Sequence, residues 1–319
     1  MKVLPNLKIG NLIAKIPIIQ GGMAVRISTA SLAAAVANEG GIGIIAATGM
    51  GLAELRREIR KARELTKGII GVNVLFAVKE FANLVKTAME EGIDLVISGA
   101  GISRDMYSWG KSFNVPVVPI VSSAKLAVIA EKMGAAAVVV EGTEAGGHLG
   151  TNRSMKEILP EVRKAVNIPV IGAGGVFTGL DILDVLALGA NGVQMGTRFA
   201  ASLESNASQA FKELYLNAKD EDITTIQSPV GLPGRAIRNS FVKKIEACEL
   251  RPKVCAKCLK YCSQNFCLLK ALNNAQRGLL EEGLVFAGQC VEKVKEIKSV
   301  KEIFQDIFRE IKTAEATAM

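Results

Sequence analysis

Several features that would indicate other classes of protein are scarce in this 319-residue sequence. It contains one histidine, one tryptophan and three tyrosines, and aromatic residues make up only 5% of the chain. The net charge of +8 would suit a nucleic-acid partner, but aromatic side chains that could stack on bases are too few, and the basic residues are interleaved with acidic ones. We therefore expect no nucleic-acid binding and attribute the positive charge to attraction of an anionic cofactor or substrate.

Long apolar segments are also absent. No uninterrupted apolar run approaches the roughly 20 residues that span a bilayer. Lysines are scattered through the first residues, and no small-residue cleavage motif follows them, so we predict no signal peptide. These features predict a soluble cytoplasmic protein that does not bind a membrane.

Short apolar runs alternate with amphipathic helical patterns from residue 16 to residue 199. The eight predicted strands lie at 16–23, 42–48, 69–76, 95–101, 115–123, 136–142, 168–175 and 192–199. This alternation predicts a (β/α)8 barrel, or TIM barrel, with a doubly wound open sheet as the alternative. The barrel is favoured because the last two strands both end in glycines, where such barrels commonly bind phosphate.

The alternating pattern ends near residue 222. We predict a barrel domain over residues 1–222 and a C-terminal appendage over residues 223–319 that packs against the mouth of the barrel. The appendage starts with loop and short-strand character in ITTIQSPVGLPGRAIRNSF, continues with a cysteine-rich segment at 248–267, and ends in two helices.

Glycines after the seventh and eighth predicted strands indicate a phosphate site. Gly174 and Gly175 precede a predicted helix, while Gly196 and Thr197 supply more backbone amides and one hydroxyl. Free amides and a helix N-terminus favour bound phosphate. Tight turns without a ligand are the alternative explanation for these glycines.

Five motifs follow one another along the predicted barrel: PIIQGGMA at 17–24, GVN at 71–73, EGTEAGGHLG at 141–150, IPVIGAGG at 168–175 and VQMGTRF at 193–199. Together they resemble the nitronate monooxygenase (2-nitropropane dioxygenase) family, which includes the flavin-dependent enoyl-ACP reductase II enzymes. VFAGQ at 285–289, followed by a terminal amphipathic helix, looks closer to the enoyl-ACP reductase II branch. The resemblance implies a TIM barrel that holds FMN at the carboxyl ends of its strands, and a homodimer.

The resemblance also implies which residues of this chain contact FMN. Those expected beside the flavin ring or the ribityl chain are Gly22, Met23, Ala24, Asn73, Glu141, Gly146 and Gly147, and those expected at the phosphate are Ala173, Gly174, Gly175, Gly196 and Thr197. Some monooxygenases carry a lysine on the fifth strand near the flavin. This chain has Ile120 in that region, and Lys125 is out of register.

His148 stands in a predicted glycine-rich loop after the sixth predicted strand. In the family that this chain resembles, the equivalent histidine lies beside the flavin and faces the substrate. There an imidazole can take a proton from a nitroalkane carbon, or polarise and protonate an activated alkene. A purely structural histidine is the alternative.

Four cysteines are concentrated near the C-terminus: Cys255, Cys258, Cys262 and Cys267. In an intracellular protein such a group more often binds metal than forms disulfides. We expect a [4Fe–4S] cluster, with zinc and metal-free redox-sensing thiols as alternatives, although the spacing matches neither ferredoxin runs nor paired CxxC zinc sites. Cys290 is interpreted as a packing residue.

These observations lead to an FMN-dependent oxidoreductase as the main hypothesis. NADH or NADPH would reduce the flavin, which would reduce an activated alkene such as an enoyl thioester, on a small molecule or an acyl carrier. The first alternative is a nitronate monooxygenase that oxidises nitronates with O2, and the second is a non-catalytic flavin or metal redox sensor. Arg235 and Arg238 either attract a phosphate-bearing substrate or form a solvated surface.

Overall fold

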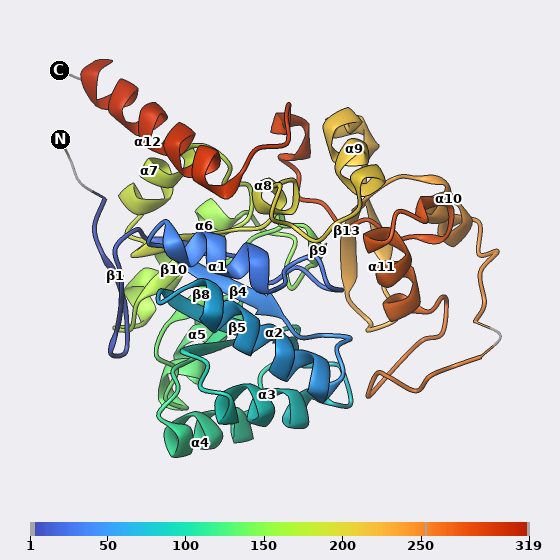
Figure 1. The fold of residues 1–319 in the computed structure, drawn as a ribbon, viewed down its shortest axis with the longest axis horizontal. Coiled ribbons are helices and arrows are strands. Elements are labelled where there is room, and N and C mark those ends of the chain that lie inside the picture. Colours follow the sequence, from blue (N-terminus) through green and yellow to red (C-terminus); the bar gives the residue numbers. More distant parts are fainter. Residues whose placement is uncertain (1–3, 253, 318–319) are drawn as a thin grey trace.

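A computed structural model describes residues 4–252 and 254–317 of the protein (Figure 1). Eight parallel strands close into a barrel, because the last of them pairs back onto the first. In barrel order from the first they are β3 (Ile18–Gln20), β4 (Ile42–Ala46), β5 (Ile69–Leu75), β6 (Leu95–Gly99), β7 (Val117–Val121), β8 (Val138–Glu141), β10 (Val170–Ala173) and β11 (Gly192–Met195). All eight lie within the predicted segments, so the TIM barrel is confirmed and the open sheet was the wrong alternative.

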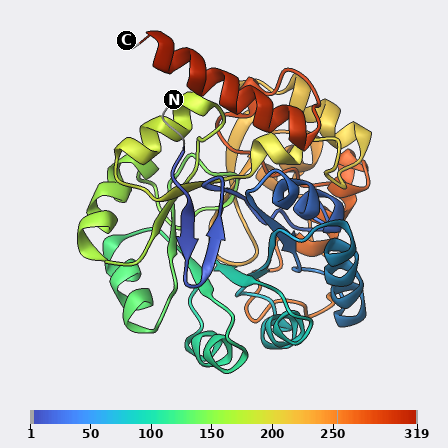
Figure 2. The same ribbon diagram turned by 60° about the vertical axis from the view of Figure 1, so that its left-hand side comes forward.

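Helices surround the barrel on its outer face (Figure 2). They are α1 (Ala30–Asn38), α2 (Leu52–Leu65), α3 (Phe81–Glu90), α4 (Arg104–Phe113), α5 (Ala124–Lys132), α6 (Met155–Ala165) and α7 (Gly179–Ala187). Helix α2 illustrates why they pack in this way, since its buried residues Leu55, Ile59 and Ala62 recur at helical spacing and its other positions are mostly charged.

A short N-terminal hairpin closes the end of the barrel opposite the mouth. Its strands are β1 (Leu7–Ile9) and β2 (Leu12–Ala14), which pair antiparallel. Leu7 and Ile9 are fully buried and belong to the same apolar cluster as Ile19 and Ile42 inside the barrel. The mouth at the other end is therefore left for ligands, as in TIM barrels generally.

The C-terminal part is woven into the barrel. Its elements are α8 (Thr197–Ala200), α9 (Gln209–Asn217), β12 (Ile223–Gln227), β13 (Pro233–Ile237), α10 (Ser240–Glu246), α11 (Leu268–Gln276) and α12 (Val300–Thr317), with short 3-10 turns at Asp220–Asp222, Leu280–Glu282 and Val291–Lys293. Helix α12 packs against α7 and α1, and β13 pairs with β9 (Gly147–His148) from the barrel. The two final helices were predicted. The division into domains at residue 222 stays a prediction.

The cysteine-rich segment, residues 248–267, lies against the loop between β5 and α3. Val78 and Leu259 form an isolated antiparallel bridge, and the Lys79 amide donates a hydrogen bond of 2.9 Å to the Cys258 carbonyl. Within the described part of the chain, no helix is both long and apolar enough to cross a membrane.

Candidate active site

A cavity with an empty volume of 1480 Å³, including its open mouth, lies at the carboxyl ends of the barrel strands. Its lining includes every predicted cofactor and catalytic residue: Gly22, Met23, Ala24, Asn73, Glu141, Gly146, Gly147, His148, Ala173, Gly174, Gly175, Gly196 and Thr197. The structure thus brings these residues together, while their individual roles stay predictions.

The loops after β10 and β11 form a cradle of backbone amides. Gly174 and Gly175 have positive φ angles of 107° and 72°, which glycine adopts at little cost. In the described residues, no protein group accepts a hydrogen bond from the amides of these two glycines or of Gly196 and Thr197. A Cβ built on Gly196 would meet nothing closer than 3.8 Å, which leaves open space beside the cradle. Such a set of unpaired donors fits a phosphate group.

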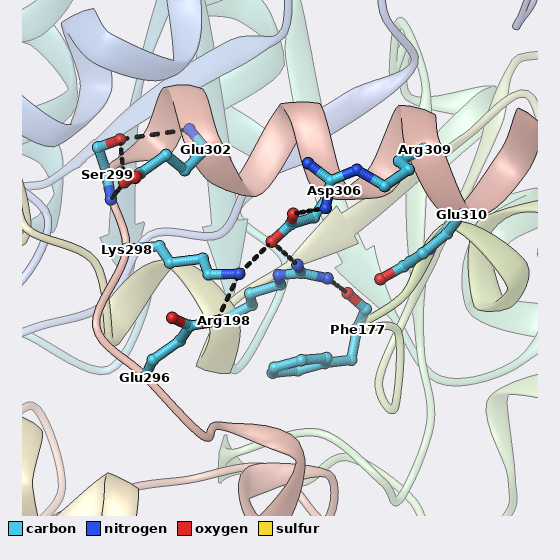
Figure 3. A network of polar contacts seen from close by, with 10 residues as sticks. Phe177, Arg198, Glu296, Lys298, Ser299, Glu302, Asp306, Arg309 and Glu310 are labelled. Atoms are coloured by element: carbon cyan, nitrogen blue, oxygen red, sulfur yellow. Dashed lines mark hydrogen bonds and ion pairs between the residues drawn. The ribbon is translucent and has the colours of Figure 1, made fainter.

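Arg198, the residue after the cradle, is buried and connects it to the C-terminal helix (Figure 3). Its guanidinium donates a hydrogen bond to the Phe177 carbonyl and lies over the ring of the same residue. It also lies 3.5 Å from Asp306 of α12, which in turn accepts a hydrogen bond of 2.6 Å from Lys298. Glu310 of α12 accepts a hydrogen bond from the amide of Gly179. Helix α12 therefore holds both loops of the amide cradle in place.

His148 was predicted in a loop, but it lies in the two-residue strand β9, which pairs with β13. The loop prediction was wrong because the pairing partner, Gly234–Arg235, is more than 80 residues away in sequence, beyond the reach of local pattern. Burial lowers the pKa of His148 to about 4, so the imidazole is neutral at neutral pH. A neutral ring on the cavity wall has one N–H that can donate a hydrogen bond and one bare nitrogen that can accept a hydrogen bond or take up a proton.

Glu141 ends β8 and faces the same cavity. Burial raises the pKa of its carboxyl to about 8, so the acid is largely protonated at neutral pH. Nearby, the side-chain oxygen Oε1 of Gln194 is buried without a hydrogen-bond partner in the described residues. Both groups line the cavity with hydrogen-bonding capacity that the described protein residues leave unused, as expected at a ligand site.

Two of the predicted glycines are also required by close packing. A Cβ on Gly22 would lie 2.3 Å from Cβ of Asn73, and one on Gly146 would lie 2.6 Å from the carbonyl carbon of Ala287. The segment 141–150, which carries His148, thus passes directly against the VFAGQ segment, 285–289. Gly146 serves this backbone approach, in addition to any contact with a cofactor.

Other cavity residues were not predicted. Those from the C-terminal part are chiefly apolar: Phe211, Tyr215, Leu268, Leu269, Leu272, Leu284, Phe286 and Cys290. Phe286 belongs to the VFAGQ motif, which had indicated a branch of the family but no role in the cavity. The α11 leucines carry no local signal that separates a cavity wall from a core. Cys290, interpreted as a packing residue, is partly exposed and lines the cavity.

The basic residues considered for the site fall in different places. Ile120 lines the cavity where some monooxygenases have lysine, and Lys125 is exposed on α5. The Arg235 side chain donates a hydrogen bond of 3.0 Å to the Thr143 carbonyl, so it stabilises the segment 141–150 that carries His148. Arg238 pairs with Glu246 at 2.9 Å on the surface.

The cysteines are free thiols, and the structure lends no support to a metal among them. Across residues 4–252 and 254–317, no group of three or more histidine, cysteine, aspartate or glutamate side chains is arranged to hold a metal ion. Burial, followed by the charges of the neighbouring thiols, raises the pKa of Cys258. A cluster or zinc at Cys255, Cys258, Cys262 and Cys267 stays a prediction.

Comparisons with known proteins agree with this site. Residues 6–310 match the family described as nitronate monooxygenase. FabK from Thermotoga maritima superposes with a TM-score of 0.86 at 36% identity, over 95% of this chain and 94% of that one. A probable nitronate monooxygenase from Staphylococcus aureus is 33% identical over 73% of this chain and 78% of its own length.

A third relative, (3aS,4S,5R,7aS)-5-hydroxy-7a-methyl-1-oxo-octahydro-1H-indene-4-carboxyl-CoA dehydrogenase from Rhodococcus jostii, is 34% identical over 72% of this chain. The match spans only 65% of the length of that relative. The family match, by contrast, extends over nearly the whole sequence and includes every residue of the cavity. The chain belongs to the nitronate monooxygenase family.

Proposed function

We propose that the protein is an FMN-dependent reductase that uses NADH or NADPH to reduce an activated carbon–carbon double bond, such as that of an enoyl thioester. The observation that carries the proposal is a neutral histidine, His148, on the wall of a cavity that also contains the amide cradle. The similarity to FabK, an enoyl-ACP reductase II, over almost the full length of both chains supports the same reaction class.

The residues of the cavity fit FMN. The unpaired amides of Gly174, Gly175, Gly196 and Thr197 would hold the phosphate, and the orphaned Gln194 oxygen and the Glu141 carboxyl would serve the polar part of the cofactor. Bound FMN would supply hydride transfer. The protein then has to orient the substrate, exclude water from the cavity and allow one proton to reach the substrate.

The substrate side of the cavity is apolar. Leu268, Leu269 and Leu272 of α11 and Phe286 line it, which suits an acyl chain better than a short polar molecule. His148, which is neutral at neutral pH, would donate a hydrogen bond to the substrate and so polarise the double bond for reduction.

Nitronate oxidation with O2 is the alternative, favoured by the family match and by the relative from Staphylococcus aureus. The same histidine would then act as a base. Ile120, which stands where some monooxygenases have lysine, counts against it. Membership of a family of enzymes counts against a non-catalytic sensor. The cytoplasmic location, the homodimer and the choice between NADH and NADPH remain predictions.

The test is turnover with two substrate classes. The FMN-loaded protein is assayed with NADH or NADPH and a short enoyl-CoA, and separately with a nitronate in air. We expect nicotinamide oxidation that depends on the enoyl-CoA and falls by about 10²- to 10⁴-fold in the variant His148→Ala. Oxygen consumption with the nitronate, together with no enoyl-CoA reduction, would transfer the assignment to the monooxygenase.

A further inference from the structure

The only hydrogen bond made by the His148 ring within the described part of the chain joins it to Ser228. Nε2 of His148 lies 2.8 Å from Oγ of Ser228. Ser228 is 2% exposed, so water does not compete for this contact. The two residues are distant in sequence, and Ser228 lies outside the motifs that pointed to the site.

The backbone holds Ser228 firmly in the turn between β12 and β13. Its amide donates a hydrogen bond of 3.0 Å to the Leu232 carbonyl, and its carbonyl accepts one of 3.0 Å from Gly231, whose φ angle is 82°. Strand β13 pairs with β9, where Gly234 stands opposite His148. The side-chain bond therefore joins strand β9 to the hairpin turn of the same small three-stranded sheet.

The cysteine-rich segment supports this turn from outside. The amide of Ser263 donates a hydrogen bond of 3.0 Å to the Pro229 carbonyl, and Asn265 reaches the Gln227 carbonyl at 3.5 Å. These carbonyls belong to the residues directly before and after Ser228. The segment thus stabilises the position of the hydroxyl that contacts His148.

The other ring nitrogen of His148 is left for a ligand. In the described residues, Nδ1 has no hydrogen-bond partner. It is also not among the fully buried polar atoms without a partner, so this nitrogen is accessible. Because His148 lines the cavity, an accessible Nδ1 opens into it. The ring also packs edge-on against Phe286, with centroids 5.2 Å apart, so a ring flip would disturb this contact as well as the Ser228 bond.

We propose that Ser228 is a positioning residue that fixes the orientation and the tautomer of His148, so that Nδ1 is the nitrogen that meets the substrate. In a neutral imidazole one nitrogen carries the proton and the other accepts, so a hydroxyl that donates to Nε2 leaves the proton on Nδ1. In the reductase proposed above, the Ser228 hydroxyl donates to Nε2, and Nδ1–H donates to the substrate. The part of the inference that concerns Nδ1 and substrate rests on the proposed function; the fixed tautomer does not.

The test uses the fact that the chain has a single histidine. The full-length protein labelled with ¹⁵N-histidine gives one set of ring-nitrogen signals, and bare and protonated nitrogens are well separated in ¹⁵N shift. We expect one tautomer, Nδ1–H, in the wild type and in Ser228→Thr, and a tautomer mixture in Ser228→Ala. The matched control is Ser205→Ala, another buried serine, whose hydroxyl accepts a hydrogen bond from Ala207 instead.

A Ser228→Ala spectrum identical to that of the wild type overturns the inference. A wild-type proton on Nε2 that is lost in Ser228→Ala supports positioning by Ser228 and counts against the reductase, since a bare Nδ1 is a base. In enoyl-CoA turnover we expect Ser228→Ala to lower kcat about tenfold with little change in KM, and Ser228→Thr to restore it. Unchanged kcat in Ser228→Ala, with a changed tautomer, would refute reaction at Nδ1. Unchanged kcat in His148→Ala would refute the proposed function itself.

Discussion

The guanidinium of Arg198 lies 3.5 Å from the carboxylate of Asp306, and this pair connects the amide cradle to the C-terminal helix α12. Arg198 follows Thr197 directly in sequence. Any ligand held by the cradle amides is therefore supported by residues more than 100 positions further along the chain.

Loss of this pair should weaken FMN binding. Asp306→Asn removes the negative charge that faces Arg198 and Lys298, so the cradle loops lose a constraint. We expect the dissociation constant for FMN to rise by about tenfold, measured by quenching of flavin fluorescence. The control is Glu302→Gln on the same helix, whose carboxylate hydrogen-bonds only Ser299 among the described residues and which should bind FMN like the wild type. Equal affinities in the two variants would contradict the supporting role of α12.

Glu141 should make the apoprotein less stable as the pH rises. Its pKa is about 8 in the folded chain against an ordinary 4.5, so the unfolded chain loses this proton first. The stabilising effect is complete below pH 4.5 and disappears as the pH approaches 8. In Glu141→Gln this loss is absent, so the stability of the variant relative to the wild type should rise between pH 5 and 8 by a few kcal/mol, on the order of the shift. Urea unfolding of both apoproteins measures it, and parallel pH profiles would exclude a raised pKa.

The segment 141–150, which carries His148, packs so closely against the VFAGQ segment that Gly146 should not accept a side chain. In Gly146→Ala the new methyl group would meet the backbone of Ala287 and Gly288 at 2.6 Å. We expect a loss of roughly 1–3 kcal/mol in the free energy of unfolding, seen as a lower midpoint in urea. Gly51→Ala is the control, because its Cβ meets nothing within 4 Å and its φ is −77°. Equal midpoints for the two variants would show that the loop moves freely.

The cysteine hypothesis predicts metal in protein purified without oxygen. Elemental analysis should find iron with acid-labile sulfide, or zinc, and Cys258→Ser should lose it while Cys290→Ser retains it. Cys290 is the suitable control because it lies on the cavity wall, outside the cysteine-rich segment. Protein free of both metals after anaerobic purification would leave reduced thiols as the explanation.

The sequence predicted the elements whose signal is local. The eight strands follow from apolar runs that end in glycine, so they were placed correctly, whereas the phosphate role of Gly174 and Gly175 stays a prediction. The pairing of His148 with Gly234, the hydroxyl of Ser228 beside the ring, and the link between Arg198 and Asp306 depend on residues that meet only after folding. No periodicity records such contacts. The N-terminal hairpin was missed because three-residue strands are too short for an alternating pattern to register.

The most direct test of the account is an anaerobic absorption titration of the FMN-loaded protein with NADH and then with NADPH. The proposed reductase predicts that at least one of the two nucleotides bleaches the flavin band, and that a short enoyl-CoA then restores it without oxygen. A flavin band that neither nucleotide bleaches, but that a nitronate does, would contradict the reductase and establish nitronate oxidation in its place.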